Sequence, residues 1–178
     1  MKLEYILEEK DFIDYHLFSF SENKRTLKTM NISKFLLVGL FIYFSYDMYN
    51  NNQIRIAIIL GILAIFILLF YNKIYQSKLK KHFSKIVKDN YMKRIGEKET
   101  MEFTSDYIIT EDKTGEGKTK ISEIEKISET QNNFFIKLSN GSSFIVPKNG
   151  LKNLEHIKNK WKELNIPIFE NLTWEWKL

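Results

Sequence analysis

Two apolar runs dominate the first half of the chain, and the polar segments around them are rich in lysine. The second run, Ile54 to Tyr71, holds 18 residues with Arg55 as its single charge. At ~1.5 Å per residue, a helix of this length reaches ~27 Å, which is close to the hydrocarbon thickness of a bilayer. The run is therefore predicted to be a transmembrane helix, and Arg55 to reach the headgroups near its start.

The first run, Phe35 to Tyr46, has 12 uncharged residues, so length alone also fits an interfacial or buried helix. Basic residues precede this run and follow the second one, whereas only Arg55 lies between them, beside the polar turn at residues 50–53. If both runs cross, both basic flanks lie on the cytoplasmic side, as the positive-inside rule requires. We therefore expect a transmembrane hairpin over residues 34–75, with spans at about 34–49 and 54–72 and both termini cytoplasmic.

The remaining segments follow the periods of strands and amphipathic helices. In the N-terminal region, residues 1–33, the alternation of Leu3, Tyr5 and Leu7 predicts a strand, and Asp11 is placed to cap a helix. After the hairpin, apolar residues at helical spacing against lysines predict a basic helical stem over residues 76–95.

Near Gly96 the period changes, and residues 96–178 are predicted to form the soluble domain. Strands are expected at residues 100–103, 107–111, 124–127, 134–138 and 143–146, with turns at 115–117 and 140–141. An apolar stripe from Leu151 to Leu164 predicts a last helix, which Pro167 prevents from running much further. For the ending Trp174-Glu175-Trp176, burial against the domain and docking on a membrane surface both stay open.

The amino-acid composition excludes several kinds of functional site. The chain has no cysteine, which excludes disulfides, thiolate metal sites and a cysteine nucleophile. The net charge of +5 comes from lysines beside the apolar runs, and no nucleic-acid-binding motif is present. His16, His82 and His156 lack metal-ligand spacing, and the glycines of 115–117 lack the context of a phosphate loop. We expect no enzyme activity, no catalytic residues, no metal and no cofactor, and no nucleic-acid partner.

The order of elements resembles a known family. The segment from Asn133 to Leu138 and on through Phe144-Ile145-Val146-Pro147-Lys148 resembles the C-terminal signature of the YcxB-like family of small bacterial membrane proteins, and Glu8 to Phe12 is similar to that family's start. The resemblance implies an α+β membrane protein whose cytoplasmic domain is a pleckstrin-homology-like antiparallel β-barrel capped by the C-terminal helix. It implies no established biochemical activity.

Two sites are candidates for binding. The lysines of the stem either fix the topology only or also bind anionic lipid of the inner leaflet; they are Lys78, Lys80, Lys81, Lys85 and Lys88. An unpaired sheet edge of the soluble domain could accept an extended segment of a partner, although the sequence does not tell which edge is exposed.

The leading functional hypothesis is a non-enzymatic module in the bacterial inner membrane that interacts with a protein or with lipid. The alternative is an immunity protein that neutralises a bacteriocin or toxin at this membrane. Assembly into a homo-oligomer stays open.

Overall fold

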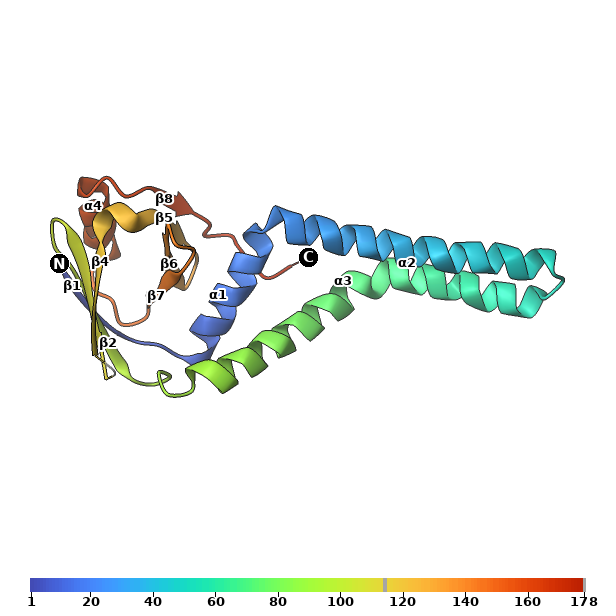
Figure 1. Ribbon diagram of the computed structural model, residues 1–178, viewed down its shortest axis with the longest axis horizontal. Helices are drawn as coiled ribbons and strands as arrows, with labels where there is room; N and C mark the ends of the chain where they lie inside the picture. Colours follow the sequence, from blue (N-terminus) through green and yellow to red (C-terminus); the bar gives the residue numbers. More distant parts are fainter. Residues whose placement is uncertain (114, 178) are drawn as a thin grey trace. The chain divides into compact units, whose positions relative to one another are not determined.

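The computed structural model describes residues 1–113 and 115–177 and contains helices and strands in alternating blocks (Figure 1). The helices are α1 (Glu9–Glu22), α2 (Lys24–Asn50), α3 (Ile54–Tyr91) and α4 (Leu154–Glu163), with a short 3-10 turn at Ile121–Glu123. The strands are β1 (Lys2–Ile6), β2 (Lys98–Phe103), β3 (Tyr107–Asp112), β4 (Gly115–Lys120), β5 (Ile124–Glu129), β6 (Asn133–Leu138), β7 (Ser143–Pro147) and β8 (Ile168–Glu170).

The chain divides into two compact units. The sheet unit comprises Met1–His16 and Ser84–Glu175, and the hairpin unit comprises Leu17–Phe83 with the last residues from Trp176. Each unit is described by itself below.

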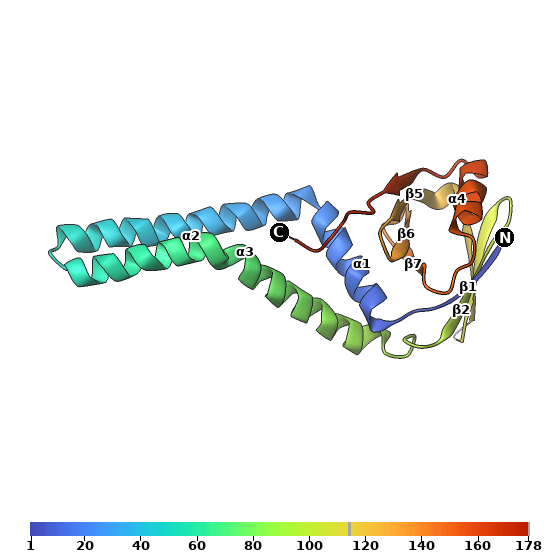
Figure 2. The ribbon, with the colours of Figure 1, turned by 180° about the vertical axis from the view of Figure 1, so that it is seen from behind.

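The hairpin unit consists mainly of α2 and of α3 as far as Phe83. Near the turn that joins them, the two helices lie side by side in both views (Figures 1 and 2). Small residues allow the two helices to approach closely: Ala57 and Ala64 are buried, and the Ser45 hydroxyl donates to the Ala57 carbonyl across 2.8 Å. The larger apolar side chains point outward, and Leu36 and Leu69 are 69% and 68% exposed. Both helices are long and apolar enough to cross a membrane, which agrees with the predicted hairpin.

Helix α1 begins at Glu9, two residues before the predicted cap, Asp11. The prediction is wrong in register because Asp11 lies in the third helical position and its Oδ2 accepts the Glu8 N–H at 2.8 Å, as the third residue of a capping box does. When the Asn133 side-chain amide is oriented with its nitrogen toward Asp11, this nitrogen donates to the other oxygen, Oδ1, at 3.1 Å. The buried carboxylate thus joins the start of α1 to strand β6.

Two open sheets of four strands replace the closed barrel that was predicted. One sheet has the order β1-β2-β3-β4 and is antiparallel throughout; the other has the order β7-β6-β5-β8, with β8 parallel to β5. No strand pairing joins β1 to β7 among the described residues, so both keep an unpaired edge. The α+β class is confirmed, and the barrel is wrong because its seam stays open.

Strand β1 pairs with a strand that is far from it in the sequence. Strand β1 pairs with β2 in a register that places Ile6 opposite Lys98 and Lys2 opposite Glu102. Helices α1, α2 and α3 therefore come between two neighbouring strands of one sheet. Leu3, Tyr5 and Leu7 are buried, as the predicted alternation requires.

Two strands depart from the sequence prediction. Gly115–Gly117 was expected to form a turn, but these residues begin β4, where Gly117 lies opposite Thr110 and Gly115 opposite Asp112. A Cβ at Gly117 would lie 2.8 Å from the Thr110 hydroxyl, so a larger residue there would require the Thr110 side chain to shift. The other departure is β8, which follows Pro167 and was not predicted.

Helix α4 closes one end of the sheet pair and completes the core (Figure 2). Trp161 is fully buried, and its ring lies 5.8 Å from that of Phe103 in one sheet and 4.9 Å from that of Phe134 in the other. Asn153 caps the start of the helix, and its side chain accepts the His156 N–H. This part of the prediction, a helix capping the strands, is confirmed.

A buried ion cluster fixes the end of β7. Glu129 of β5 is 3% exposed, and its carboxylate lies 2.7 Å from Lys148 Nζ and 3.4 Å from Lys158 Nζ. The Lys148 ammonium also lies 4.8 Å from the centre of the Phe134 ring. Pro147 precedes it on the edge strand, where no N–H is required.

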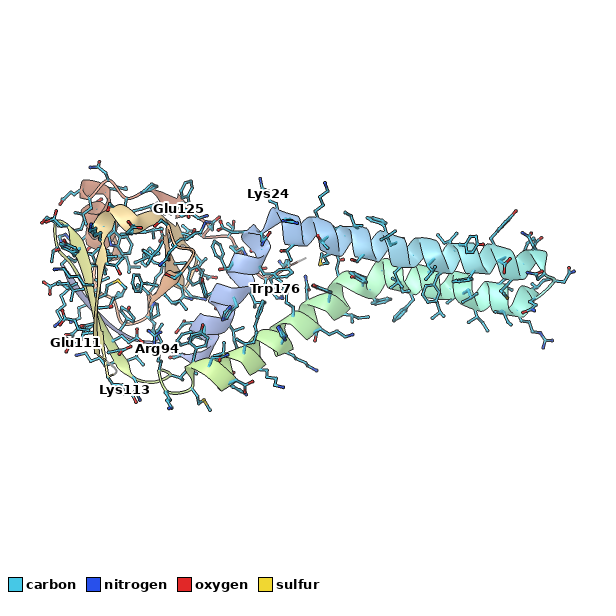
Figure 3. All side chains as sticks on the ribbon, in the orientation of Figure 1. Lys24, Arg94, Glu111, Lys113, Glu125 and Trp176 are labelled. Atoms are coloured by element: carbon cyan, nitrogen blue, oxygen red, sulfur yellow. The ribbon has the colours of Figure 1, made fainter. Side chains whose placement is uncertain are left out.

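Trp176, in the chain ending, packs within the hairpin unit. Figure 3 labels Trp176. Its ring lies 6.0 Å from that of Phe20, whose ring also lies near those of Tyr75 and Phe83. Trp174 belongs to the sheet unit, whereas Trp176 packs on a helix aromatic of the hairpin unit; docking on a membrane surface stays a prediction.

Candidate functional site

All five predicted lipid-binding lysines lie on α3 and are exposed. Lys78, Lys80 and Lys81 belong to the hairpin unit, and Lys85 and Lys88 belong to the sheet unit. Lys88 Nζ lies 3.8 Å from Glu9, which neutralises part of its charge. The other four form no ion pair with another described residue.

The three histidines lie on separate helices. His16 is on α1, His82 on α3 and His156 on α4. Burial lowers the pKa of His16. Among the described residues, no three His, Asp or Glu side chains are grouped so that they could hold a metal ion.

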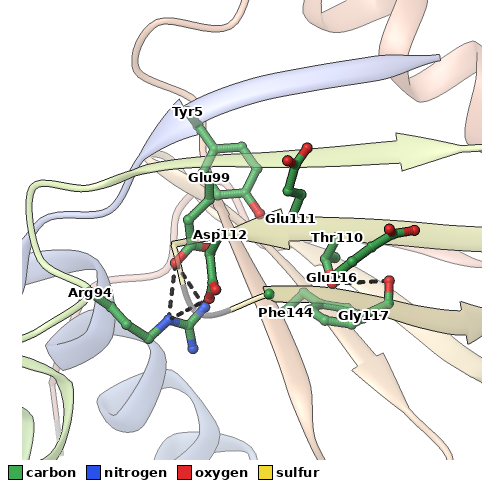
Figure 4. A pocket seen from close by; sticks show the side chains of 10 residues that line it. Tyr5, Arg94, Glu99, Thr110, Glu111, Asp112, Glu116, Gly117 and Phe144 are labelled. Carbon is green, nitrogen blue, oxygen red and sulfur yellow. Dashed lines mark hydrogen bonds and ion pairs between the residues drawn. The ribbon is translucent and has the colours of Figure 1, made fainter.

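A cavity of about 280 Å³ lies at the end of the first sheet that carries Glu99 and Asp112 (Figure 4). Its ionic lining was not predicted. Arg94 follows α3, and its Nε and Nη2 donate to Glu99 Oε1 at 3.0 and 2.8 Å. Asp112 Oδ2 lies 3.8 Å from Arg94 Nε. Sequence reasoning missed this group because its members come from separate elements and Arg94 stands among the many basic residues of the stem.

Burial shapes the electrostatics of this cavity. Glu99 is 6% exposed, and the resulting desolvation raises its pKa, although Arg94 acts in the opposite direction. Burial also raises the pKa of the Tyr5 phenol, and the Glu99 carboxylate adds to that effect. Because the guanidinium binds both carboxylates, the arrangement ties β2 and β3 to the segment that follows α3.

The two sheets have four edges, which differ in their suitability for a partner strand. Strand β8 has three residues, and β7 is mostly buried and ends in Pro147. Strand β4 carries Lys118 and Lys120 on its exposed surface, a feature that discourages edge pairing. Strand β1 offers five residues with alternating burial and an open groove beside them.

We call this the β1 groove: three adjoining cavities of about 380, 440 and 390 Å³ that follow β1. The cavity at the middle of β1 is lined by Glu4 and Ile6. Residues 147–152, from the end of β7 onward, form the opposite wall of the three cavities. Neighbouring cavities share Glu4 and Gly150 in one case and Ile6 and Asn149 in the other. The groove therefore runs along the whole strand.

The main chain of β1 faces this groove at every second residue. Met1 and Phe103 exchange both hydrogen bonds, at 2.8 and 2.7 Å, which fixes Leu3 and Tyr5 as the next residues bonded to β2. The N–H and C=O groups of Lys2, Glu4 and Ile6 consequently point away from β2. No hydrogen bond joins them to another described segment.

Comparison with known proteins identifies one family. A model of the family described as "YcxB-like protein" matches residues 103–158, from the end of β2 into α4. This match confirms the resemblance expected from the sequence, and it contains the Asn133 to Lys148 segment on which that resemblance chiefly depends. The searches of curated proteins and of solved structures each found no match.

Proposed function

We propose that this chain is a non-enzymatic integral membrane protein that presents a pleckstrin-homology-like sheet domain at the inner leaflet, where the domain interacts with a protein or with anionic lipid. The observation that carries the proposal is the insertion of an exposed apolar helix pair between β1 and β2, two neighbouring strands of one sheet.

The exposed surface of the hairpin supports the membrane part. In each helix, 11% of the apolar window is buried inside the protein, so most of its Leu, Ile and Phe side chains need another apolar environment. A bilayer provides it, and the interhelical contacts of Ser45, Ala57 and Ala64 are the small-residue contacts typical of membrane helices.

The strand order supports the domain part. The proposal of a pleckstrin-homology-like domain is supported by four antiparallel strands, a second sheet and a C-terminal helix across the end. The long connection between β1 and β2 contains the hairpin. Both chain connections of the hairpin then lead into the same sheet, which tethers the domain at two points. Such a tether suits a domain that acts at a membrane surface.

Thiol labelling in a chain without native cysteine tests this topology. Asn51→Cys at the hairpin turn should react with a membrane-impermeant maleimide in intact cells, and Ser142→Cys in the exposed β6–β7 turn should react only after the cells are opened. Both proteins should stay with membranes through an alkaline carbonate wash. Labelling of Ser142→Cys in intact cells, or release by carbonate, would reject the proposal.

A further inference from the structure

The β1 groove has two properties that indicate an extended ligand. Its floor carries unpaired main-chain donors and acceptors from Lys2, Glu4 and Ile6, whose spacing matches that of a strand. Its length corresponds to three adjoining cavities rather than one compact pocket. An extended peptide satisfies both features, because its own main chain supplies the complementary groups.

Some charged side chains along the groove form ion pairs and others do not. Glu4 pairs with Lys98 at 2.7 Å and Glu8 with Lys10 at 3.0 Å, so the acids of the middle section are already neutralised. At the Met1 end, the cavity is lined by Lys2 and Lys152, and neither forms an ion pair with another described residue. This end of the groove is therefore complementary to an acidic side chain.

The opposite section holds one exposed apolar side chain, Ile6, among mostly polar residues. Ile6 is 52% exposed and lines two of the three cavities. An apolar side chain of a bound strand would cover it, since side chains on adjacent strands lie about 5 Å apart.

We propose that the β1 groove binds an extended segment of a partner protein as an added strand, with an acidic side chain over Lys2 and Lys152 and an apolar side chain against Ile6. This inference rests on the proposed function and specifies its partner as a protein segment. The two can fail separately, because thiol labelling reports the membrane topology whether or not the groove binds peptide.

The test uses the full chain in neutral detergent and a seven-residue peptide of alternating threonine and valine with one aspartate near an end. A matched peptide carries lysine in place of aspartate. The aspartate peptide should bind at least fivefold more tightly than the lysine peptide at low salt, and the difference should shrink as salt rises. Equal binding of the two peptides, or no binding at millimolar concentration, would overturn the proposal.

Amide exchange gives a signature of strand addition. The bound peptide should slow exchange of the Glu4 and Ile6 N–H groups and leave those of Leu3 and Tyr5 unchanged, because the latter two already bond to β2. Protection that appears without peptide and grows with protein concentration would indicate a second copy of this chain as the occupant and would also overturn the proposal.

Two variants separate the main chain from the side chain. Glu4→Pro removes an N–H that β2 does not use, and should weaken peptide binding about tenfold, whereas Glu4→Ala loses the Lys98 ion pair but should bind normally. Equal binding by both variants would contradict strand addition. If the proline variant does not fold, Lys2→Glu with Lys152→Glu provides the second test: preference should switch to the lysine peptide, and an unchanged preference rejects the assignment.

Discussion

The ion pair between Arg94 and Glu99 tests how the first sheet is stabilised. Arg94 reaches the carboxylate with two donors, and the Glu99 side chain is 8% exposed, whereas that of Arg94 is 41% exposed. Arg94→Met keeps most of the apolar stem but removes the charge. The variant therefore leaves a nearly buried carboxylate without its cation.

The expected cost follows from this geometry. Removing one member of a fully buried pair costs about 3–5 kcal/mol, and partial exposure of the arginine lets water replace some of the lost interaction. We therefore expect Arg94→Met to lower the free energy of unfolding by about 2–3 kcal/mol at pH 7. Loss of Arg94 also removes the interaction that counteracts burial, so the pKa of Glu99 rises further in the variant.

The pH dependence has a definite sign. A carboxyl group whose pKa is higher in the folded than in the unfolded state contributes its full stability below the unfolded pKa, about 4.3, and loses it as pH rises through the folded pKa. The pKa of Glu99 is raised in the wild type and more so in the variant. The stability difference between the two proteins should therefore shrink as pH falls from 7 toward 4.

Unfolding of the full chain in detergent, followed by fluorescence of the buried Trp161, measures both effects once Trp174 and Trp176 are replaced by phenylalanine. The control is Lys113→Met, which breaks the exposed ion pair with Glu97 (Figure 3) and should cost less than about 1 kcal/mol. The reasoning is refuted if both variants lose the same stability at pH 7, or if the Arg94→Met deficit grows in acid.

Two further predictions concern lipid and packing. The double variant Lys78→Gln, Lys81→Gln should retain less fluorescent phosphatidylglycerol in detergent, by about fivefold per lysine at low salt. The control Lys120→Gln on β4 should retain as much as the wild type. Equal retention by the wild type and both variants would leave the stem lysines with a topological role. Gly117→Ala should destabilise the sheet unit by about 1 kcal/mol in the same unfolding assay, because its Cβ would lie 2.8 Å from the Thr110 hydroxyl. Adding Thr110→Ala should relieve the loss. A Gly117→Ala variant as stable as the wild type would contradict the steric argument.

Elements with a strong local signal could be predicted from the sequence. The hairpin of β6 and β7 is one, because Phe134, Ile136 and Leu138 alternate and Asn140-Gly141 supplies the turn, where Gly141 has a φ of +85°. The two apolar helices are another, since their length and hydropathy decide them without tertiary information.

Strand β4 shows what local reasoning cannot reach. Its sequence, Gly-Glu-Gly-Lys-Thr-Lys, contains no apolar residue and has two glycines, so neither alternation nor propensity favours a strand. It is a strand because β3 offers an unpaired edge and the chain returns beside it. The Arg94 cavity and the β1 groove were missed for the same reason, because both depend on segments that are adjacent only after the sheets form.

The pairing of β1 with β2 requires two segments that are far apart in the sequence to meet, which carries a cost in loop-closure entropy. Residues 7–97 lie between β1 and β2, and a flexible loop of about 90 residues costs about 3 kcal/mol more to close than a turn of about four residues. A helical hairpin returns the chain toward its starting point, so most of this cost is met when α2 and α3 pair. Strand β1 and the residue after it also bring Leu3, Tyr5 and Leu7 into the core. A fragment that starts after the hairpin would lack these side chains and expose the inner edge of β2, so binding studies of the sheet unit require the full chain.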